Sequence, residues 1–201
     1  MAYVKAAERE GQIVAAAIRV LVADGVAGTT LRAVAAESDI ALGTMHYVFA
    51  TKDALLRAVI RAVAADVSAA LRAGAEVDQG VTHALRRSVG NFWTTLVEHE
   101  IGLQIMQYEL AMYSARTEGP GGLAQLLYEQ YTSLVAEFCE QAARAAGERC
   151  AVDFETLGRL SLAVMDGLIV QYVANPDLER ARRDLDRAVD MVVRYADPRP
   201  R

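Results

Sequence analysis

The sequence predicts an all-α protein with a small three-helix head and a larger helical body, about nine helices in total. Three observations predict this fold class. Apolar residues recur at spacings of three and four along most of the chain, which is the period of an amphipathic helix. Clusters of Gly, Pro and Asp interrupt that pattern at only a handful of places. No stretch of the sequence indicates a sheet.

Residues that favour helix ends predict where the first four helices begin and stop. Asp24 and Gly25 close the first apolar stripe, because glycine accepts the left-handed backbone found at helix C-termini. Thr30 and Thr51 are expected N-caps, since a threonine hydroxyl accepts a hydrogen bond from an amide of the first turn. The expected helices are residues 6–23, 30–37, 42–49 and 51–73.

The rest of the chain is expected to form five longer helices with apolar stripes. Breaks at Gly74, at "EGPGG" (118–122) and around 147–153 separate them. The tail "DPRPR" at 197–201 is expected to be frayed. The five expected helices are residues 81–98, 101–117, 122–146, 154–174 and 178–195.

The composition narrows the class of protein. Hydrophobic residues make up 53% of the chain, so most of it is expected to fold. The net charge of −5 argues against a general nucleic-acid coat, and residues 1–52 hold five basic and five acidic side chains. No apolar run reaches the ~18 residues that cross a bilayer. Cys139 and Cys150 have neither a partner motif nor metal spacing. We therefore expect a cytoplasmic protein with no membrane contact, no cofactor and no metal.

The stretch "TTLRAVAAESDIALGTMHYVFATKDALL" at 29–56 predicts a helix-turn-helix. Ala35 is small enough for the two short helices to approach closely, and Asp39 tolerates the left-handed backbone of the turn. Met45 is expected to point inward beside Val34. The outer surface of the second helix then suits a phosphate backbone and base edges. It carries Leu42, Gly43, Thr44, His46 and Tyr47.

The same stretch resembles the DNA-binding head of the TetR family of bacterial transcriptional repressors. The matching features are Thr29 and Thr30, the "AxxA" of the first short helix, Gly43 with Thr44, the aromatic group His46, Tyr47 and Phe49, and Lys52 with Leu55. The helix lengths of the body and "MDGLIVQYVANPD" at 165–177 are similar to the family's regulatory body. The resemblance implies a DNA-binding domain at 1–50 and a ligand-binding and dimerisation domain at 51–201. The chain departs from the family at Ala41, where Ser or Thr is usual.

The resemblance implies a ligand-responsive regulator, by default a repressor, that binds a palindromic double-stranded operator. It implies phosphate contacts from Thr30, Arg32, Tyr47 and Lys52. It implies base-edge contacts from Thr44, with Leu42 and His46 as further candidates. The alternative is a three-helix cap on a helical body, in which His46 and Tyr47 only pack against other side chains.

A single head covers one half-site, and family members dimerise so that two heads lie one DNA turn apart, ~34–36 Å. The expected seam joins helices 122–146 and 154–174 to their symmetry mates in a four-helix bundle. In the second of these helices small residues alternate with larger apolar ones, which permits close approach. The small residues are Gly158, Ser161, Ala163 and Gly167. The alternative is that both helices are ordinary core.

The resemblance places effector sensing on helix 101–117. Methionine and aromatic side chains form adaptable apolar walls, and Glu109 would supply a polar anchor for a cationic ligand. The same residue types at this spacing equally suit an ordinary core. The candidate ligand-binding residues are Phe92, Trp93, Leu96, Met106, Glu109, Leu110, Met112 and Tyr113.

Two rival functions remain open, a helical-bundle enzyme and a protein-binding adaptor without DNA binding. His46, His83 and His99 are scattered, and no Glu-x-x-His pair occurs. The "GPGG" segment lacks the strand and the Lys-Ser/Thr pair of a phosphate-binding loop. The sequence therefore predicts no catalytic and no metal-binding residue. Steeply salt-dependent binding to an operator duplex would separate a regulator from both rivals.

Overall fold

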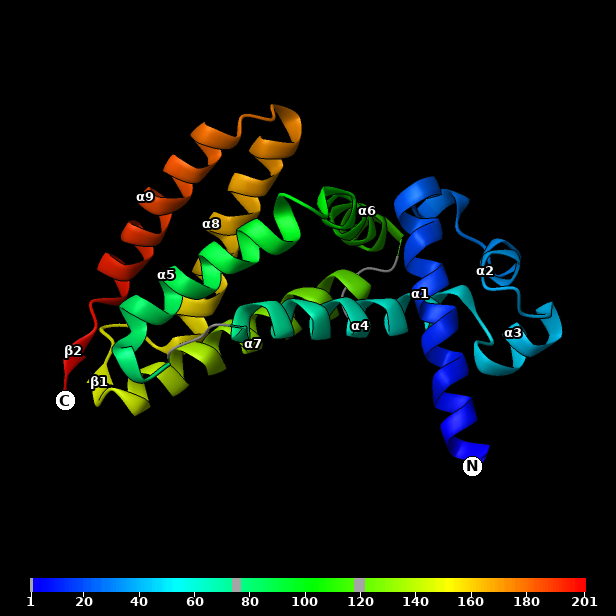
Figure 1. The fold of residues 1–201 in the computed structure, drawn as a ribbon, viewed down its shortest axis with the longest axis horizontal. Helices are drawn as coiled ribbons and strands as arrows, with labels where there is room; N and C mark the ends of the chain where they lie inside the picture. Colours follow the sequence, from blue (N-terminus) through cyan, green and yellow to red (C-terminus); the bar gives the residue numbers. More distant parts are fainter. Residues whose placement is uncertain (1, 74–76, 118–121) are drawn as a thin grey trace. The chain divides into compact units, whose positions relative to one another are not determined.

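The computed structural model describes residues 2–73, 77–117 and 122–201, and within these ranges the chain is almost entirely helical (Figure 1). The described residues form α1 (Ala2–Gly28), α2 (Leu31–Glu37), α3 (Leu42–Val48), α4 (Lys52–Arg72), α5 (Gly80–Phe92), α6 (Ile101–Thr117), α7 (Leu123–Ala145), α8 (Phe154–Ala174) and α9 (Leu178–Ala196). This confirms the all-α class and the helix-turn-helix at the N-terminal end. The predicted breaks at Gly74 and at 118–121 lie outside the described residues.

Backbone contacts group the chain into two compact units. The first unit is 1–65 with 102–127, and the second is 66–101 with 128–201. The first unit therefore contains the head, the start of α4 and nearly all of α6. The functional division at residue 50 stays a prediction, because contact grouping does not assign function.

The head of the first unit closes around buried apolar side chains of α1, α2 and α3. Ile13, Val34 and Met45 are each fully buried. Arg19 Nε donates to Glu37 Oε1 at 2.6 Å and braces α1 against α2 at the surface. Val22 of α1 is 45% exposed although it is apolar. Its methyl group lies beside Gly102 at the start of α6, where a Cβ would meet Val22 Cγ1 at 2.9 Å.

The helical path of α1 is interrupted at Gly25, as predicted. Gly25 has φ 68° and ψ −178°, although the hydrogen-bonded span continues to Gly28. A side chain at Gly25 would also meet Glu109 Oε2 of α6 at 2.9 Å. Thr29 follows with its hydroxyl donating to the Gly25 carbonyl at 2.8 Å. Gly25 is therefore favoured by its backbone conformation, and a side chain there would also have to displace the Glu109 carboxylate.

The second unit is built on α5, α7, α8 and α9, of which α8 and α9 are antiparallel neighbours (Figure 1). At Gly158 a Cβ would come within 2.7 Å of the Thr132 carbonyl oxygen, so α7 and α8 cross with little space between their backbones. Both cysteines are free thiols, and burial raises the pKa of Cys139 to about 12. A core cluster of this unit comprises Val81, Ala84, Leu85, Phe138, Cys139, Ala142, Ala143, Leu157, Val189 and Ala196.

The C-terminal tail is ordered, so the expectation of a frayed end was wrong. β2 (Arg199–Pro200) pairs antiparallel with β1 (Glu148–Arg149), and the amide of Arg201 donates to the Gly147 carbonyl at 2.9 Å. This ribbon also corrects the expectation of no sheet, since strands of two residues leave no periodicity in a sequence. β1 holds Glu148 where its carboxylate accepts from the Val81 amide at 2.8 Å, at the start of α5.

The helix expected over 81–98 is two elements. α5 ends at Phe92, and a π-helical turn, η2 (Trp93–Val97), follows it. A short 3₁₀ turn, η1 (Val77–Gln79), precedes α5. Apolar spacing did not reveal the change, because a single π turn shifts the helical register by only one residue.

Among the residues that the structure describes, two helices have the length and composition of a membrane span, although charged residues interrupt the apolar sequence of each. They are Ala7–Gly28, whose apolar window is 39% buried, and Phe154–Ala174, whose window is 22% buried. The prediction concerned unbroken apolar runs, and this result does not contradict it, because the test tolerates one or two charges. Core helices pass the same test, so the result is weak evidence for a membrane. Leu160 and Val170 of α8 are 40% and 50% exposed, so part of its apolar surface is uncovered within one chain.

Two glycines of α1 provide a matched test of this packing. Gly25→Ala is expected to lower the free energy of unfolding by about 1–2 kcal/mol, because alanine is strained at positive φ and its Cβ meets Glu109. Gly11→Ala is expected to raise it by about 0.5–1 kcal/mol, because Gly11 lies in an exposed part of the helix with nothing within 4 Å. Urea unfolding of both variants measures the difference. Equal effects from the two substitutions would contradict the role assigned to Gly25.

Candidate nucleic-acid interface

The turn between α2 and α3 follows local rules. The Ala33 amide donates to Thr30 Oγ1 at 3.0 Å, so Thr30 caps α2 as predicted. Asp39 has φ 54°, which confirms the left-handed residue in the turn. Ala41 occupies the N-cap position of α3 and makes no side-chain hydrogen bond, so the first amides of α3 lack a side-chain acceptor from that position.

The outward surface of α3 carries the side chains that the sequence analysis proposed for DNA. Tyr47 is 90% exposed, and His46 is exposed beside it. Gly43 has open space where a side chain would stand. Leu42 and Thr44 are half-buried at the edge of the same surface. Met45 lies on the opposite side in the core, so the helix presents one apolar and one free face.

The two basic candidates differ in their surroundings. Arg32 is exposed on α2. The Lys52 ammonium donates to the Val26 carbonyl at 2.5 Å and lies 5.7 Å from the centre of the Tyr113 ring. Partial burial there lowers the pKa of Lys52. An ammonium has three donors, so a phosphate contact from Lys52 stays a prediction, while its bond to Val26 ties α4 to the end of α1.

The structure divides the candidate ligand-binding residues between the two units. Within the first unit, Met106 and Leu110 are each 1% exposed, whereas Met112 and Tyr113 point to the surface. Glu109 is exposed and lies against Gly25. In the second unit Trp93 and Leu96 are buried, and Phe92 is half-buried. Their roles in ligand binding stay predictions.

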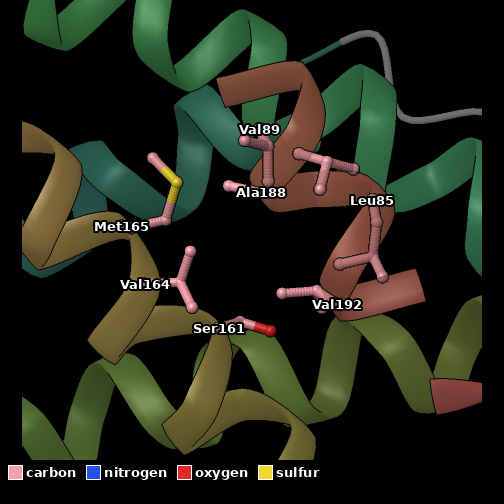
Figure 2. A pocket seen from close by; sticks show the side chains of 8 residues that line it. Leu85, Val89, Ser161, Val164, Met165, Ala188 and Val192 are labelled. Atoms are coloured by element: carbon pink, nitrogen blue, oxygen red, sulfur yellow. The ribbon is translucent and has the colours of Figure 1, made fainter. Parts of the chain in front are cut away.

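A small apolar notch lies between α5, α8 and α9 (Figure 2). Its volume of ≈ 20 Å³ holds about one water molecule, so it is too small for an effector. Figure 2 shows Val164 and Met165 of α8 facing Ala188 and Val192 of α9 across it. The other lining residues are Leu85, Val89, Ser161 and Val189.

Several residues that shape these regions were missed by the sequence analysis. Glu98 and Arg182 form a two-pronged ion pair, and the Tyr172 ring lies beside Trp93 at a tilt of 57°. Tyr128 is hydrogen-bonded to Asp166, and burial together with that carboxylate raises the pKa of Tyr128 to about 12. These partners are far apart in the sequence, so no local motif signals them. In the described part of the chain no three His, Cys, Asp or Glu side chains gather to hold a metal.

A short capped helix, a left-handed turn and a second helix with a free polar face define a helix-turn-helix DNA-binding protein. Residues 13–59 match the family described as "Bacterial regulatory proteins, tetR family", and residues 106–194 match "BetI-type transcriptional repressor, C-terminal". The chain belongs to the TetR family of bacterial transcriptional regulators. The family consists of regulators and not of enzymes.

Individual relatives agree with this assignment. The nicotine-responsive transcriptional repressor HdnoR of Paenarthrobacter nicotinovorans is 27% identical over 183 residues, which cover 91% of this chain and 93% of the relative. The regulator BetI of Burkholderia thailandensis is 30% identical, over 68% of this chain and 69% of the relative. Among solved structures, the multidrug binding protein EbrR complexed with imidazole is 29% identical with a TM-score of 0.61, over 90% of this chain and 89% of that one.

Two neighbouring residues of α3 test the division between core and free face. Met45→Ala is expected to lower the free energy of unfolding by about 2–5 kcal/mol, because the side chain is fully buried. Tyr47→Ala is expected to change it by no more than about 0.5 kcal/mol but to weaken operator binding about tenfold or more, the loss typical of a hydrogen bond to a charged group. Thermal unfolding and fluorescence anisotropy with a labelled duplex measure the two effects. A Tyr47→Ala protein with full operator affinity would remove Tyr47 from the interface.

Proposed function

We propose that this protein is a cytoplasmic repressor that binds a palindromic operator as a homodimer and releases it when a small, mainly apolar effector binds. The observation that carries the proposal is the free face of α3, with Tyr47 standing 90% exposed beside Gly43. A tyrosine so exposed has little reason to be there for stability. It is well placed to reach a phosphate while α3 lies in the major groove.

Dimerisation is supported by an apolar surface on α8. Its exposed residues Leu160, Ala163, Gly167 and Val170 recur at spacings of three and four and carry no charge. Such a surface on one helix is typical of a helix–helix interface. We place α8 at the centre of the seam, as expected from the sequence.

The second helix of the seam is better supplied by α9 than by the expected α7. From Gln125 to Arg144 every exposed residue of α7 is polar. On α9, by contrast, Met191 is 58% exposed and Tyr195 is 47% exposed. Gly158, expected in the seam, faces α7 within the chain. The proposed interface is therefore a four-helix bundle of α8 and α9 from each chain.

The first unit contains contacts that would transmit an effector signal to the head. Three contacts connect α6 to the end of α1 and the start of α4: Gly102 with Val22, Glu109 with Gly25, and Tyr113 with Lys52. A shift of α6 must therefore move α1 or break these contacts. An effector that binds the shifted form tenfold better than the operator-binding form gives a bias of ~1.4 kcal/mol.

The relatives indicate the kind of effector. HdnoR is named as nicotine-responsive, and EbrR is described as a multidrug binding protein. Both descriptions concern small organic molecules. We propose an effector of the same general class for this protein.

The operator proposal is tested with inverted repeats taken from the DNA next to the gene. The expected result is tight binding of one dimer per repeat, with affinity falling steeply as salt rises because phosphate contacts release counterions. Anisotropy titrations at several salt concentrations measure this, with a scrambled duplex as the control. Equal affinity for the repeat and the scrambled duplex would mean that the protein is not a sequence-specific regulator.

The seam is tested by placing charges on it. Leu160→Glu and Val170→Glu are each expected to give monomers and to weaken operator binding at least tenfold, because two half-sites are no longer linked. Ser133→Glu on the exposed polar side of α7 is the matched control and should remain dimeric. Analytical ultracentrifugation reads out the assembly, and circular dichroism confirms the fold. A dimer that survives both α8 substitutions but is broken by Ser133→Glu would shift the seam to α7.

A further inference from the structure

The turn after α5 is a π-helix, and it begins at the single tryptophan of the sequence, Trp93. The Glu98 amide donates to the Trp93 carbonyl at 3.0 Å, five residues back rather than four. Isolated π turns inside helical proteins occur frequently at functional sites, because the extra residue turns a side chain toward a new direction.

Trp93 has a polar atom that the described residues leave unsatisfied. The side chain is 1% exposed, yet Nε1 has no hydrogen-bond partner among the described residues. The Tyr172 ring of α8 lies beside it, with 5.6 Å between ring centroids and 57° between ring planes. A buried donor without an acceptor is unfavourable and rare in folded proteins. Nε1 is therefore a natural partner for an acceptor on a ligand.

The negative charge of Glu98, near Trp93, is already neutralised by an ion pair. The Glu98 side chain is only 9% exposed, and both of its oxygens accept from Arg182 of α9, at 2.9 and 2.6 Å. The hydrogen bonds and charge of Glu98 raise the pKa of Arg182, and nearby Tyr172 adds a smaller electrostatic contribution. The second unit thus offers a donor and an aromatic face at this place, beside a neutralised carboxylate.

We infer that Trp93 and Tyr172, flanked by the Glu98–Arg182 pair, form the recognition end of the effector site, and that the effector is a nitrogen heterocycle. Its ring nitrogen accepts a hydrogen bond from Trp93 Nε1, and its ring lies against Tyr172. Recognition depends on this acceptor and on ring shape rather than on positive charge. The inference rests on the proposed function and specifies the effector of that regulator.

The unique tryptophan makes the site directly observable. Full-length protein is titrated with imidazole at about pH 8, where the ring is mostly neutral and one nitrogen is an acceptor. A saturable change in Trp93 fluorescence is expected. The 1,3-dimethylimidazolium ion, which is positively charged and has no free acceptor, is expected to bind at least tenfold more weakly. Stronger binding of the cation than of imidazole would overturn recognition through the acceptor.

A replacement that removes only the donor separates hydrogen bonding from packing. Expression in a tryptophan auxotroph replaces Trp93 by 3-benzothienylalanine, which keeps the ring size and exchanges N–H for sulfur. Imidazole affinity, measured by calorimetry, is expected to fall about tenfold or somewhat less. The control Phe138→Leu removes a buried ring from the core cluster of the same unit. It should lower stability and leave imidazole affinity unchanged.

The outcomes distinguish this inference from the proposed function. If the protein binds its operator but imidazole neither binds nor perturbs Trp93, the inference fails and the regulator assignment stands. Undiminished affinity in the 3-benzothienylalanine protein likewise overturns the inference. If imidazole binds at Trp93 but no inverted repeat is bound, the site stands as a ligand site and the regulator function fails.

Discussion

The first unit depends on the interruption of α1 at Gly25. If α1 continued in regular helical geometry, its last carbonyls would accept hydrogen bonds from amides of the next turn. The path breaks at φ 68°, and the Val26 carbonyl accepts from Lys52. The Gly25 carbonyl keeps its bond from the Thr29 amide at 3.2 Å and also accepts from the Thr29 hydroxyl at 2.8 Å. These bonds connect the end of α1 to the start of α4 and to the residue that precedes the N-cap of α2. Gly25 also admits the carboxylate of Glu109, which a side chain at this position would displace.

Interactions that act over a few residues were sufficient to predict the structure of the helix-turn-helix head. Thr30, Asp39 and Met45 are determined by capping, by backbone conformation and by helical spacing, which act over a few residues. Lys52 and Glu109 are different, since their contacts come from elements 26 or more positions away. The sequence identified Lys52 as basic and Glu109 as acidic and assigned them to ligands. It contained no signal that Val26 and Gly25 would be their neighbours.

In the body, too, contacts between residues far apart in the sequence could not be predicted from short stretches of it. Gly158 and Gly167 have the same apolar surroundings in the sequence, so both were assigned to one seam. In the structure Gly158 faces the α7 backbone, and Gly167 faces open space. Two small residues nine positions apart, which is half a turn out of phase on an α-helix, thus serve different contacts. The π turn at Trp93 and the ribbon at Glu148 are likewise set by tertiary contacts that short sequence windows do not contain.

The head carries no net charge, so we expect its binding to the operator to depend on the positions of a few directed contacts. Residues 1–52 hold equal numbers of basic and acidic side chains, so general attraction to DNA contributes little to the affinity of one head. Affinity must then come from a few directed contacts of α3, made twice at a fixed separation. Contacts of this kind are lost when either head turns away, whereas diffuse attraction would survive the change. A bias of ~1.4 kcal/mol between two head positions therefore changes the operator affinity up to tenfold, and α6 needs no large movement to produce it.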